Sequence, residues 1–383
     1  MTLLIWSGVL LYVCLLLLST GTWLSIASFK PKPPLRNGEG ILFNERILVT
    51  VIIPVRNEAG NIRILLEDLN RQTLNFATFE VIVVDDHSTD DTARLVSEFV
   101  PKAHYTLKVI SLADPMPWSP KKQAITQAMA EARGELIVTT DGDCRVLAGW
   151  LETLYQFYQA KDACLISGPV TFYQESSWFE QMQSVEFASL IGAGAVSLTL
   201  GLPTMCNGAN LAYPQWVFKE VGGYGGVDRI ASGDDEFLLH KIARKYPKQV
   251  FFLKSPGAIV RTFAQKSLRN FYQQRRRWGS KWKYYQDNRV KILAFFIFTL
   301  NFGLLLATIG VIAGLYPFKV FIYQYLLKSG VEGIFLGWVL CDLKKCNRVW
   351  WIPGVQVLYP LYVSITGLAA QGGTYQWKGR SMR

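Results

Sequence analysis

The fold is decided between residues 48 and 86. Residues 48–58 read LVTVIIPVRNE, and residues 79–86 read FEVIVVDD. Each stretch is a run of apolar, mostly β-branched residues that ends in polar side chains, which is typical of a buried strand. Between them, residues 62–74 have apolar positions at helical spacing. Together these stretches predict a β-α-β unit.

The same alternation continues along the chain. Residues 92–99 and 121–133 have helical patterns, and residues 105–112 and 135–139 have strand patterns. Strands that alternate with helices predict an α/β fold with a mainly parallel sheet that is covered on both faces.

Polar clusters follow three of the predicted strands. They comprise Pro54, Asn57 and Glu58 after the first strand, Asp85 and Asp86 after the second, and Asp141 and Asp143 after the fourth. Ligands of open α/β sheets bind beyond the carboxyl ends of the strands. We therefore expect the three clusters to converge on one crevice.

The amino-terminal segment predicts a membrane anchor. Hydrophobic residues make up 50% of the 383 residues, and residues 3–29 contain no charge. This run is long enough to cross a hydrocarbon layer of roughly 30 Å. Lys30, Lys32 and Arg36 follow it, which indicates that its carboxyl end lies in the cytoplasm. A cleaved signal peptide is the alternative, but no positive charge precedes the run, which exceeds the usual core of roughly 7–15 residues.

Two further apolar segments lie near the carboxyl end. Residues 292–318 carry no charge, and residues 349–370 are apolar and aromatic, so both predict membrane helices. Residues 320–340 are interrupted by Lys328 and Glu332, and predict either a span that bears polar residues or a re-entrant or interfacial segment. Counting this segment as a span places the basic tail outside, against the positive-inside tendency. The sequence leaves this conflict open.

The predicted order is a transmembrane helix at 1–29, a linker rich in Pro and Gly at 30–47, a cytoplasmic α/β domain with interfacial helices at 48–290, and a membrane region of two to three helices with a short basic tail at 291–383. Residues 187–206 are also apolar, but another span would separate the acidic motifs across the membrane. A buried or membrane-surface helix is expected there. The prediction is a multi-pass protein of the inner, cytoplasmic membrane.

Charge and cysteine content argue against two kinds of partner. The chain has 40 Lys and Arg against 29 Asp and Glu, a net charge of +11. Many of these cations flank apolar segments or lie among aromatic residues at 261–283, which favours an anionic membrane surface over nucleic acid. The six cysteines show no CxxC spacing, so zinc and a disulfide framework are not expected, and the thiols are predicted to be reduced.

Asp141 and Asp143 are the candidate metal ligands. They stand one residue apart after a predicted buried strand, and a turn at Gly142 lets both carboxylates approach one cation. Hard oxygen ligands beside a diphosphate select Mg²⁺ or Mn²⁺. Surface loops also carry Asp-x-Asp by chance, and the position directly after a strand favours the metal site.

Two other acidic motifs predict ligand binding and proton transfer. Asp85 or Asp86 is free to accept hydrogen bonds from a nucleobase or ribose, because the polar residues that follow account for capping of the next helix. Asp235 follows Asp234 at the start of an apolar-periodic segment, where an acidic residue also favours a helix amino terminus. As a function, its carboxylate takes the proton of an acceptor hydroxyl, and we assign both residues to the catalytic set.

The sequence QRRRW at residues 274–278 predicts a binding helix. Gln274, Arg277 and Trp278 lie at positions i, i+3 and i+4, so they share one helix face. Arg277 is expected to contact a diphosphate, with Gln274 and Trp278 framing the acceptor site. The remaining cations are expected to meet lipid headgroups: Arg275, Arg276, Lys281 and Lys283.

The motifs, in this order, resemble those of the family 2 glycosyltransferases with a GT-A fold, over about residues 48–290. The resemblance implies inversion at the anomeric carbon by direct displacement. It also implies roles for individual residues: contacts to a uridine-type nucleotide at Glu58 and at Asp85 or Asp86, a diphosphate contact at Lys121, metal binding at Asp143 with Asp141 nearby, and the catalytic base at Asp235.

The QRRRW element is similar to that of hyaluronan, cellulose and poly-N-acetylglucosamine synthases and of ceramide glucosyltransferases. Residues 233–235 read GDD where many synthases have TED, which resembles the hyaluronan type. Polymer-extruding synthases carry more membrane helices, and the ending YQWKGR at 375–380 is similar to the tail of lipid-modifying members. The resemblance implies metal-dependent transfer of a hexose or N-acetylhexosamine from a nucleotide sugar, a UDP-sugar, to a membrane lipid. The alternatives are a processive synthase with a glycan acceptor, a non-catalytic membrane scaffold and, last, a glycosidase.

Overall fold

The computed structural model describes residues 2–32, 46–113, 119–285, 287–369, 375–377 and 380–382. It divides into two units, and each is described by itself. The sheet unit comprises Ile26–Gln174 and Ser197–Phe263, and the helical unit comprises Met1–Ser25, Glu175–Val196 and Ala264–Arg383. Two pieces of the predicted 48–290 domain, 175–196 and 264–290, therefore belong to the helical unit. Most of the predicted linker and of the basic tail lies outside the described residues.

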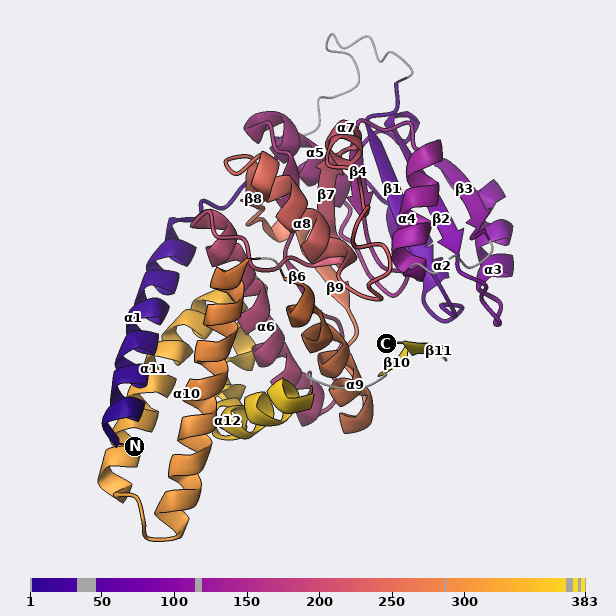
Figure 1. Ribbon diagram of the computed structural model, residues 1–383. Coiled ribbons are helices and arrows are strands. Elements are labelled where there is room, and N and C mark those ends of the chain that lie inside the picture. Colours follow the sequence, from indigo (N-terminus) through magenta and orange to yellow (C-terminus); the bar gives the residue numbers. More distant parts are fainter. Residues whose placement is uncertain are drawn as a thin grey trace. The chain divides into compact units, whose positions relative to one another are not determined.

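A seven-stranded sheet forms the core of the sheet unit, in the order β3-β2-β1-β4-β7-β5-β8 (Figure 1). Its strands are β1 (Val49–Val55), β2 (Phe79–Asp85), β3 (Thr106–Ser111), β4 (Leu136–Thr139), β5 (Leu165–Ser167), β7 (Leu211–Pro214) and β8 (Val250–Phe252). Strand β7 is antiparallel to both neighbours, and the other pairs are parallel. A two-stranded parallel sheet joins β6 (Val170–Phe172) and β9 (Val260–Thr262). The predicted mainly parallel α/β fold is confirmed.

Helices cover this sheet and bury its strands. All seven residues of β2 are buried, as are six of the seven residues of β1. The helices are α2 (Ile62–Leu69), α3 (Thr92–Phe99), α4 (Pro120–Glu131), α5 (Trp150–Lys161), α7 (Gln215–Glu220) and α8 (Asp234–Lys245). In α2, Leu65, Leu66 and Leu69 are completely buried. Burial of each such side chain contributes about 1.5–3 kcal/mol to folding.

The strand register gathers the polar ends of β1, β2 and β4 at one edge of the sheet. β1 and β2 pair in parallel from Val49 with Phe79 to Val55 with Asp85. β4 pairs in parallel with β1 on its other side. Because parallel strands end at the same edge, the residues that follow all three strands lie along that edge.

The helical unit contains six α-helices among the described residues: α1 (Thr2–Ser25), α6 (Trp178–Thr199), α9 (Leu268–Gly279), α10 (Asn288–Ile312), α11 (Phe318–Asp342) and α12 (Ile352–Ala369). The last three residues of α6 belong to the sheet unit. A short hairpin joins β10 (Tyr375–Trp377) and β11 (Arg380–Met382). Helix α1 packs against α10 and α11, and α12 runs at a steep angle to α10 (Figure 1).

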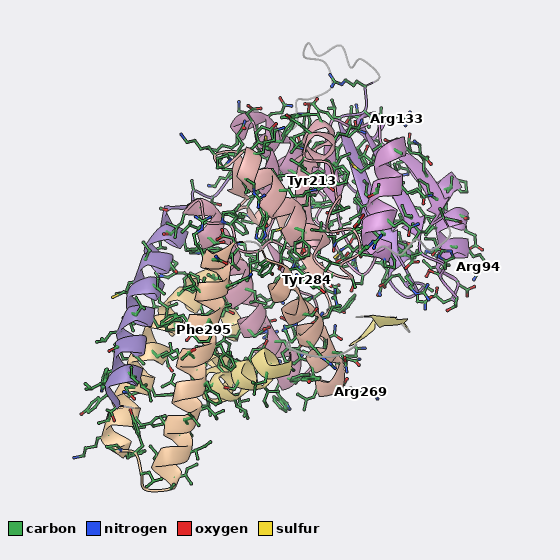
Figure 2. The ribbon with its side chains drawn as sticks, viewed as in Figure 1. Arg94, Arg133, Tyr213, Arg269, Tyr284 and Phe295 are labelled. Carbon is green, nitrogen blue, oxygen red and sulfur yellow. A yellow bond between two sulfur atoms is a disulfide. The ribbon has the colours of Figure 1, made fainter. Side chains whose placement is uncertain are left out.

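The surface of the helical unit is apolar. In the part of the chain that the structure describes, three helical segments are long and apolar enough to cross a membrane: α1, α10 and Cys346–Ala369, which contains α12. Large side chains on α1 and α10 are exposed, with Leu3 at 82%, Ile312 at 83% and Phe295 at 69%, the last labelled in Figure 2. Lipid accommodates such surfaces, whereas water penalises them. The helical unit therefore fits the predicted membrane protein.

Helix α11 buries the two charges that interrupt its apolar sequence. Lys328 Nζ lies 2.5 Å from Oε2 of Glu332, and the two side chains are 1% and 5% exposed. Lys328 also donates to Oε1 of Gln356 at 2.9 Å and lies over the rings of Tyr12 and Tyr359. The pair thus faces α1 and α12, where each charge has a partner.

Two of the six cysteines form a disulfide, which corrects the prediction that all thiols are reduced. Cys341 is the penultimate residue of α11, and Cys346 begins the next 3₁₀-helix. The turn between them brings their Cα atoms to 4.2 Å. The prediction failed because this pairing depends on a local turn rather than on a CxxC pattern. The free thiols are Cys14, Cys144, Cys164 and Cys206.

Candidate active site

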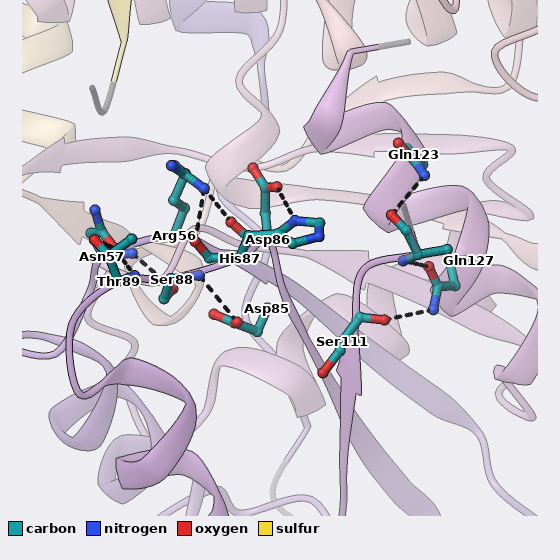
Figure 3. Close-up of polar contacts among 11 residues, drawn as sticks. Arg56, Asn57, Asp85, Asp86, His87, Ser88, Thr89, Ser111, Gln123 and Gln127 are labelled. Atoms are coloured by element: carbon teal, nitrogen blue, oxygen red, sulfur yellow. Dashed lines mark hydrogen bonds and ion pairs between the residues drawn. The ribbon is translucent and has the colours of Figure 1, made fainter. Parts of the chain in front are cut away.

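Hydrogen bonds connect the loop after β2 to the residues that follow β1. The Arg56 guanidinium donates to the carbonyl oxygens of Asp86 and His87, at 2.6 and 2.9 Å (Figure 3). Asn57 Oδ1 accepts from the backbone N–H of Thr89 at 2.8 Å. Asn57 has φ +53°, a left-handed conformation that Asn tolerates better than most residues. These bonds hold the polar residues of the first two strands together.

Asp85 carries an unsatisfied oxygen atom. The residue is 8% exposed, and its Oδ2 accepts from the N–H of Ser88 at 3.2 Å. Its Oδ1 is buried and has no hydrogen-bond partner among the described residues. A buried carboxylate oxygen without a donor is costly, and a ligand that supplies an N–H or O–H removes that cost. Asp85 is therefore suited to accept a hydrogen bond from a bound molecule.

Three other predicted residues lie at the same edge. Pro54 is part of β1. Glu58 is 7% exposed, and its Oε2 accepts from the Asn61 amide at 2.7 Å. Asp86 is 4% exposed, and its Oδ1 lies 3.2 Å from Nδ1 of His87. The structure brings these residues together with Asp85, but the carboxylates of Glu58 and Asp86 already have partners within the protein.

Gly142 lets the 141–143 loop approach the end of β1. A Cβ atom on Gly142 would lie 2.8 Å from Cγ1 of Val55 and 3.1 Å from Cγ of Glu58. The first distance is too short for two carbon atoms, so this approach requires glycine. The loop that carries the two predicted metal ligands therefore lies against the residues that follow β1.

Lys121 lies at the centre of an acidic cluster. Its Nζ is 2.7 Å from Oδ1 of Asp141 and 3.2 Å from Oδ2 of Asp234. The three residues come from α4, the loop after β4 and the start of α8. Burial lowers the pKa of the Lys121 ammonium, but the carboxylates of Asp141, Asp234 and Asp235 outweigh this effect and raise the pKa above its ordinary value. Lys121 is therefore positively charged at neutral pH.

The first turn of α8 presents Asp234 and Asp235. The helix begins at Asp234, directly after Gly233, whose φ is +82°. Asp235 Oδ2 accepts from the N–H of Gly208 at 3.0 Å, and its Oδ1 accepts from the N–H of Glu236 at 2.8 Å. Backbone donors therefore fix the orientation of the Asp235 carboxylate.

Asp234 is more deeply buried in the cluster, with 15% of its side chain exposed. Burial raises the pKa of the Asp234 carboxyl, Lys121 acts against this rise, and the nearby carboxylates of Asp235 and Asp141 add to it. Three carboxylates thus surround one ammonium group. The excess negative charge favours a further cation at this place.

The donor set fits a divalent cation that is shared with a substrate. In the part of the chain that the structure describes, no three His, Cys, Asp or Glu groups are arranged to hold a metal ion. Mg²⁺ and Mn²⁺ need only one or two carboxylates when substrate phosphates and water complete their coordination. Asp141, with 39% of its side chain exposed, and the half-buried Asp143 meet that requirement.

The QRRRW residues lie on α9 of the helical unit. Arg275 is only 4% exposed, and its Nε donates to Oε1 of Glu186 on α6 at 2.9 Å. Its Nη1 donates to Oε1 of Gln274 at 2.5 Å, and its guanidinium lies 4.3 Å from the ring centre of Trp278. The prediction that Arg275 meets lipid headgroups is wrong, because Glu186 supplies a buried partner.

Arg277 has a different environment. It is half-buried, and its guanidinium forms no hydrogen bond or ion pair with any residue that the structure describes. It is therefore available to an anionic ligand. The headgroup prediction also fails for Lys281, which is 5% exposed.

Sequence analysis missed the residues that hold the loop before α8. Residues 222–226 of this loop read GGYGG. Lys122, which is completely buried, donates from Nζ to the carbonyl oxygens of Val227 and Ile230 at 2.6 and 2.8 Å. Lys241 Nζ donates to the carbonyl of Gly223 at 2.7 Å. The density of glycine was the available signal for a shaped loop, but the ammonium groups that bind its carbonyls are visible only in three dimensions.

Comparisons with known proteins relate this chain to glycosyltransferases. Residues 50–222 match the family model described as "Glycosyl transferase family 2". The glycosyltransferase GlyG of Streptococcus pneumoniae serotype 4 is 30% identical over 129 residues, which is 34% of this chain and 41% of that protein. The poly-beta-1,6-N-acetyl-D-glucosamine synthase of Staphylococcus epidermidis is 21% identical over 241 residues, which is 60% of this chain and 53% of that protein.

A solved structure shares the fold. The mannosyltransferase PcManGT from Pyrobaculum calidifontis, in complex with GDP-Man and Mn²⁺, matches with a TM-score of 0.55 at 17% identity and covers 96% of this chain and 94% of that chain. The chain spans 41% of GlyG and 53% of the synthase, about half of each. The family match includes Asp85, Lys121, Asp141 and Asp143, and ends before Asp234.

Proposed function

Because this chain belongs to the family 2 glycosyltransferases, we propose that it is a hexosyltransferase that moves a hexose or N-acetylhexosamine from a UDP-sugar to a hydroxyl group of a membrane lipid. The observation that carries this proposal is the cluster in which Lys121 lies between Asp141 and Asp234, with Asp235 beside them. The apolar surface of the helical unit favours an acceptor that is itself in the membrane. We assign the reaction to the cytoplasmic face of the inner membrane.

The donor nucleotide contacts the edge formed by β1, β2 and β4. Asp85 Oδ1 accepts an N–H of the base or an O–H of the ribose, which satisfies its missing hydrogen bond. Lys121 contacts the diphosphate as a point charge. The proposal also retains the other residues that the sequence predicts for the site: Pro54, Asn57, Glu58 and Asp86 around the nucleotide, Arg277 on the diphosphate, and Gln274 and Trp278 near the acceptor.

Asp141 and Asp143 would hold Mg²⁺ or Mn²⁺, whose chemistry is to neutralise the charge that develops on the departing diphosphate. Lys121 supplies a second positive charge to the same leaving group. Asp141 and Asp234 hold the Lys121 ammonium in position before the reaction, and a charge that is positioned in advance stabilises the transition state most effectively.

Asp235 acts as the general base. Its carboxylate takes the proton of the acceptor hydroxyl while that oxygen attacks the anomeric carbon, and the bond from the sugar to the nucleoside diphosphate breaks. Direct displacement inverts the anomeric configuration. The N–H groups of Gly208 and Glu236 each bind one carboxylate oxygen and thereby hold the carboxylate in one orientation.

A processive polysaccharide synthase with a glycan acceptor is the second candidate. The similarity to the Staphylococcus epidermidis synthase extends over 60% of this chain and therefore beyond the family match. The two candidates share the donor chemistry and differ in the length of the product.

The test is turnover of a panel of UDP- and GDP-sugars by the purified protein in native lipid extract with Mn²⁺, followed by mass spectrometry. A lipid heavier by one sugar supports the proposal, and a repeating mass ladder identifies a polymer synthase. Asp143→Ala and Asp235→Asn should abolish turnover without changing the thermal midpoint. Asp91→Asn, at an exposed position, is the control and should keep its turnover. Full activity in both active-site variants, or no turnover of any donor, would reject the proposal, and the second result together with no UDP binding would favour a scaffold.

A further inference from the structure

We propose that Asp68 and Arg145 position the turn that carries the two candidate metal ligands. This turn comprises residues 141–144 and is called the metal turn. All of these residues belong to the sheet unit. The role rests on the proposed function, in which Asp141 and Asp143 hold a divalent cation. Asp68 and Arg145 are positioning residues, because they act through the metal turn and contact neither the cation nor the substrate.

A backbone hydrogen bond closes the metal turn. The N–H of Cys144 donates to the carbonyl oxygen of Asp141 at 3.1 Å, so Asp141 is the first residue of the turn and Asp143 the third. Their carboxylates can bind one cation together only while the backbone between them keeps one conformation. Loops are more mobile than helices and strands, so other segments must hold both ends of this turn.

Backbone pairing holds the chain on both sides of the metal turn. Before the turn, the N–H of Thr140 donates to the carbonyl oxygen of Ile52 in β1 at 3.3 Å. After it, the N–H of Arg145 donates to the carbonyl oxygen of Arg261 in β9 at 2.7 Å, and the N–H of Arg261 donates back at 2.9 Å. These bonds determine where the chain enters and leaves the turn.

The side chain of Arg145 adds a contact that determines orientation. Its Nε donates to Oδ2 of Asp68 at 2.6 Å, and its Nη2 donates to Oδ1 at 3.0 Å. The N–H of Val146 also donates to Oδ2, at 3.3 Å, and the guanidinium lies 5.4 Å from the ring centre of Tyr173. Two parallel bonds between a guanidinium and a carboxylate fix their relative orientation as well as their distance. The pair therefore orients the residue that directly follows the metal turn.

Helix α2 supports the metal turn at two points. Asp68 lies near the end of α2 and holds Arg145. At the other end, the N–H of Ile62, the first residue of α2, donates to the carbonyl oxygen of Glu58 at 2.9 Å, and Glu58 lies against Gly142. The apolar side chains of α2 are buried, so the helix is a firm base for both contacts.

Stability alone does not explain a carboxylate at position 68. The other buried residues of α2 are Ile62, Leu65, Leu66 and Leu69, and the side chain of Asp68 is only 7% exposed. Apolar residues of similar volume often replace a buried ion pair with no loss of stability, or with a gain. What the pair supplies is a defined geometry, at the place where the chain leaves the two candidate ligands.

The affinity for Mn²⁺ in the presence of saturating UDP tests this role, with free Mn²⁺ measured by electron paramagnetic resonance. Asp68→Asn and Arg145→Met should each weaken Mn²⁺ binding by about 10-fold or more, as loss of groups that orient metal ligands commonly does. The double variant should lose no more than the weaker-binding single variant, because the two groups act as one pair. Saturating Mn²⁺ should restore kcat in all three variants, since the ligands themselves are intact.

Arg71→Met is the matched control. Arg71 approaches the same carboxylate at 3.5 Å, but its side chain is 66% exposed, and Mn²⁺ affinity should stay unchanged. Asp68→Asn keeps the shape of the side chain, so it provides the test if Arg145→Met does not fold.

The possible outcomes separate this role from the proposed function. If the unmodified protein binds no Mn²⁺ with UDP, the metal site itself is wrong, and the role of Asp68 and Arg145 is wrong with it. If the unmodified protein binds Mn²⁺ and Asp68→Asn binds it equally well, the metal site stands and the positioning role is rejected. A lower thermal midpoint with unchanged Mn²⁺ affinity would show that the pair only stabilises the fold.

Discussion

The backbone N–H of Gly208 donates to Oδ2 of Asp235 at 3.0 Å, although the two residues are 27 positions apart in the sequence. Gly208 precedes β7, and Asp235 lies in the first turn of α8. A Cβ atom on Gly208 would lie 3.1 Å from Oδ2 of Asp234 and 3.3 Å from Nζ of Lys121. The absence of a side chain at this position thus allows the proposed base and the acidic cluster to come together.

Gly208→Ala should therefore lower kcat by about 10-fold or more, since a loss of about 1.4 kcal/mol in the transition state is a factor of ten. The added methyl group displaces Asp234 or Lys121 and bends the bond to Asp235. Gly60→Ala is the matched control, because nothing lies within 4 Å of its added Cβ atom. Steady-state kinetics measure both variants, and equal kcat in Gly208→Ala and the unmodified protein would contradict this role.

Lys121→Met should weaken UDP binding and lower kcat/KM by about 10²–10³-fold, the usual cost of removing one group that stabilises developing charge. The substitution also leaves Asp141 and Asp234 without their shared ammonium partner. Titration calorimetry with UDP and kinetics measure the two effects. Lys161→Met, at the exposed end of α5, is the control, and unchanged UDP affinity in Lys121→Met would exclude the proposed diphosphate contact.

Glu80→Gln should lower the thermal midpoint at pH 7. The Glu80 carboxylate is completely buried and accepts from the N–H and Nε of Arg133 and from the Thr50 hydroxyl. Burial raises the pKa of Glu80, but these hydrogen bonds and Lys108 outweigh it and hold the pKa below its ordinary value. Disturbing such a buried, charge-assisted network costs about 1–3 kcal/mol.

The lowered pKa of Glu80 also predicts that its contribution to folding stability depends on pH. Because the folded-state pKa of Glu80 is depressed, its stabilising contribution is present above the unfolded value of about 4.3 and is lost as the pH falls through the folded value. The difference in midpoint between Glu80→Gln and the unmodified protein should therefore shrink below about pH 4. Glu98→Gln, whose side chain is 52% exposed, is the control, and a difference that grows on acidification would contradict the assignment.

Arg275→Met and Glu186→Gln should each lower the thermal midpoint, because either change leaves a buried group without its charged partner, at a cost of about 3–5 kcal/mol. The double variant should lose less than the sum of the two, since the groups form one pair. Arg269→Met, an exposed position on the same helix and labelled in Figure 2, is the control. Strictly additive losses would show that the pair does not stabilise the unit.

Arg277→Ala should weaken UDP binding without changing the thermal midpoint. The Arg277 guanidinium forms no hydrogen bond or ion pair with the described residues, so its removal breaks no polar interaction among them. Loss of one charged contact to a diphosphate corresponds to about 10-fold or more in affinity. Calorimetry with UDP is the measurement. A lower midpoint with unchanged affinity would assign Arg277 a structural role instead.

Much of the fold was predictable because its signals are local. The strand pattern at 79–84 and the helix pattern at 92–99 correspond to β2 and α3, since alternation, burial and β-branching are properties of a short segment. The edge at which the acidic residues lie was predictable too, because parallel strands must end together. The apolar lengths of α1 and α10 likewise indicated the membrane.

The partners of individual side chains were decided only by the tertiary structure. Arg275, Arg276 and Arg277 are identical in the sequence, yet Arg275 is buried against Glu186, 89 residues away, while Arg277 is left available for a ligand. The charge of Lys328 on α11 likewise acquires its partners only in the tertiary structure, which brings Gln356, Tyr12 and Tyr359 around it. The composition of a segment and the spacing of its apolar residues show that it is helical and apolar. The charge and length of a side chain are fixed by the sequence, but its partner is not. Packing of the helices determines which other side chains lie within its reach.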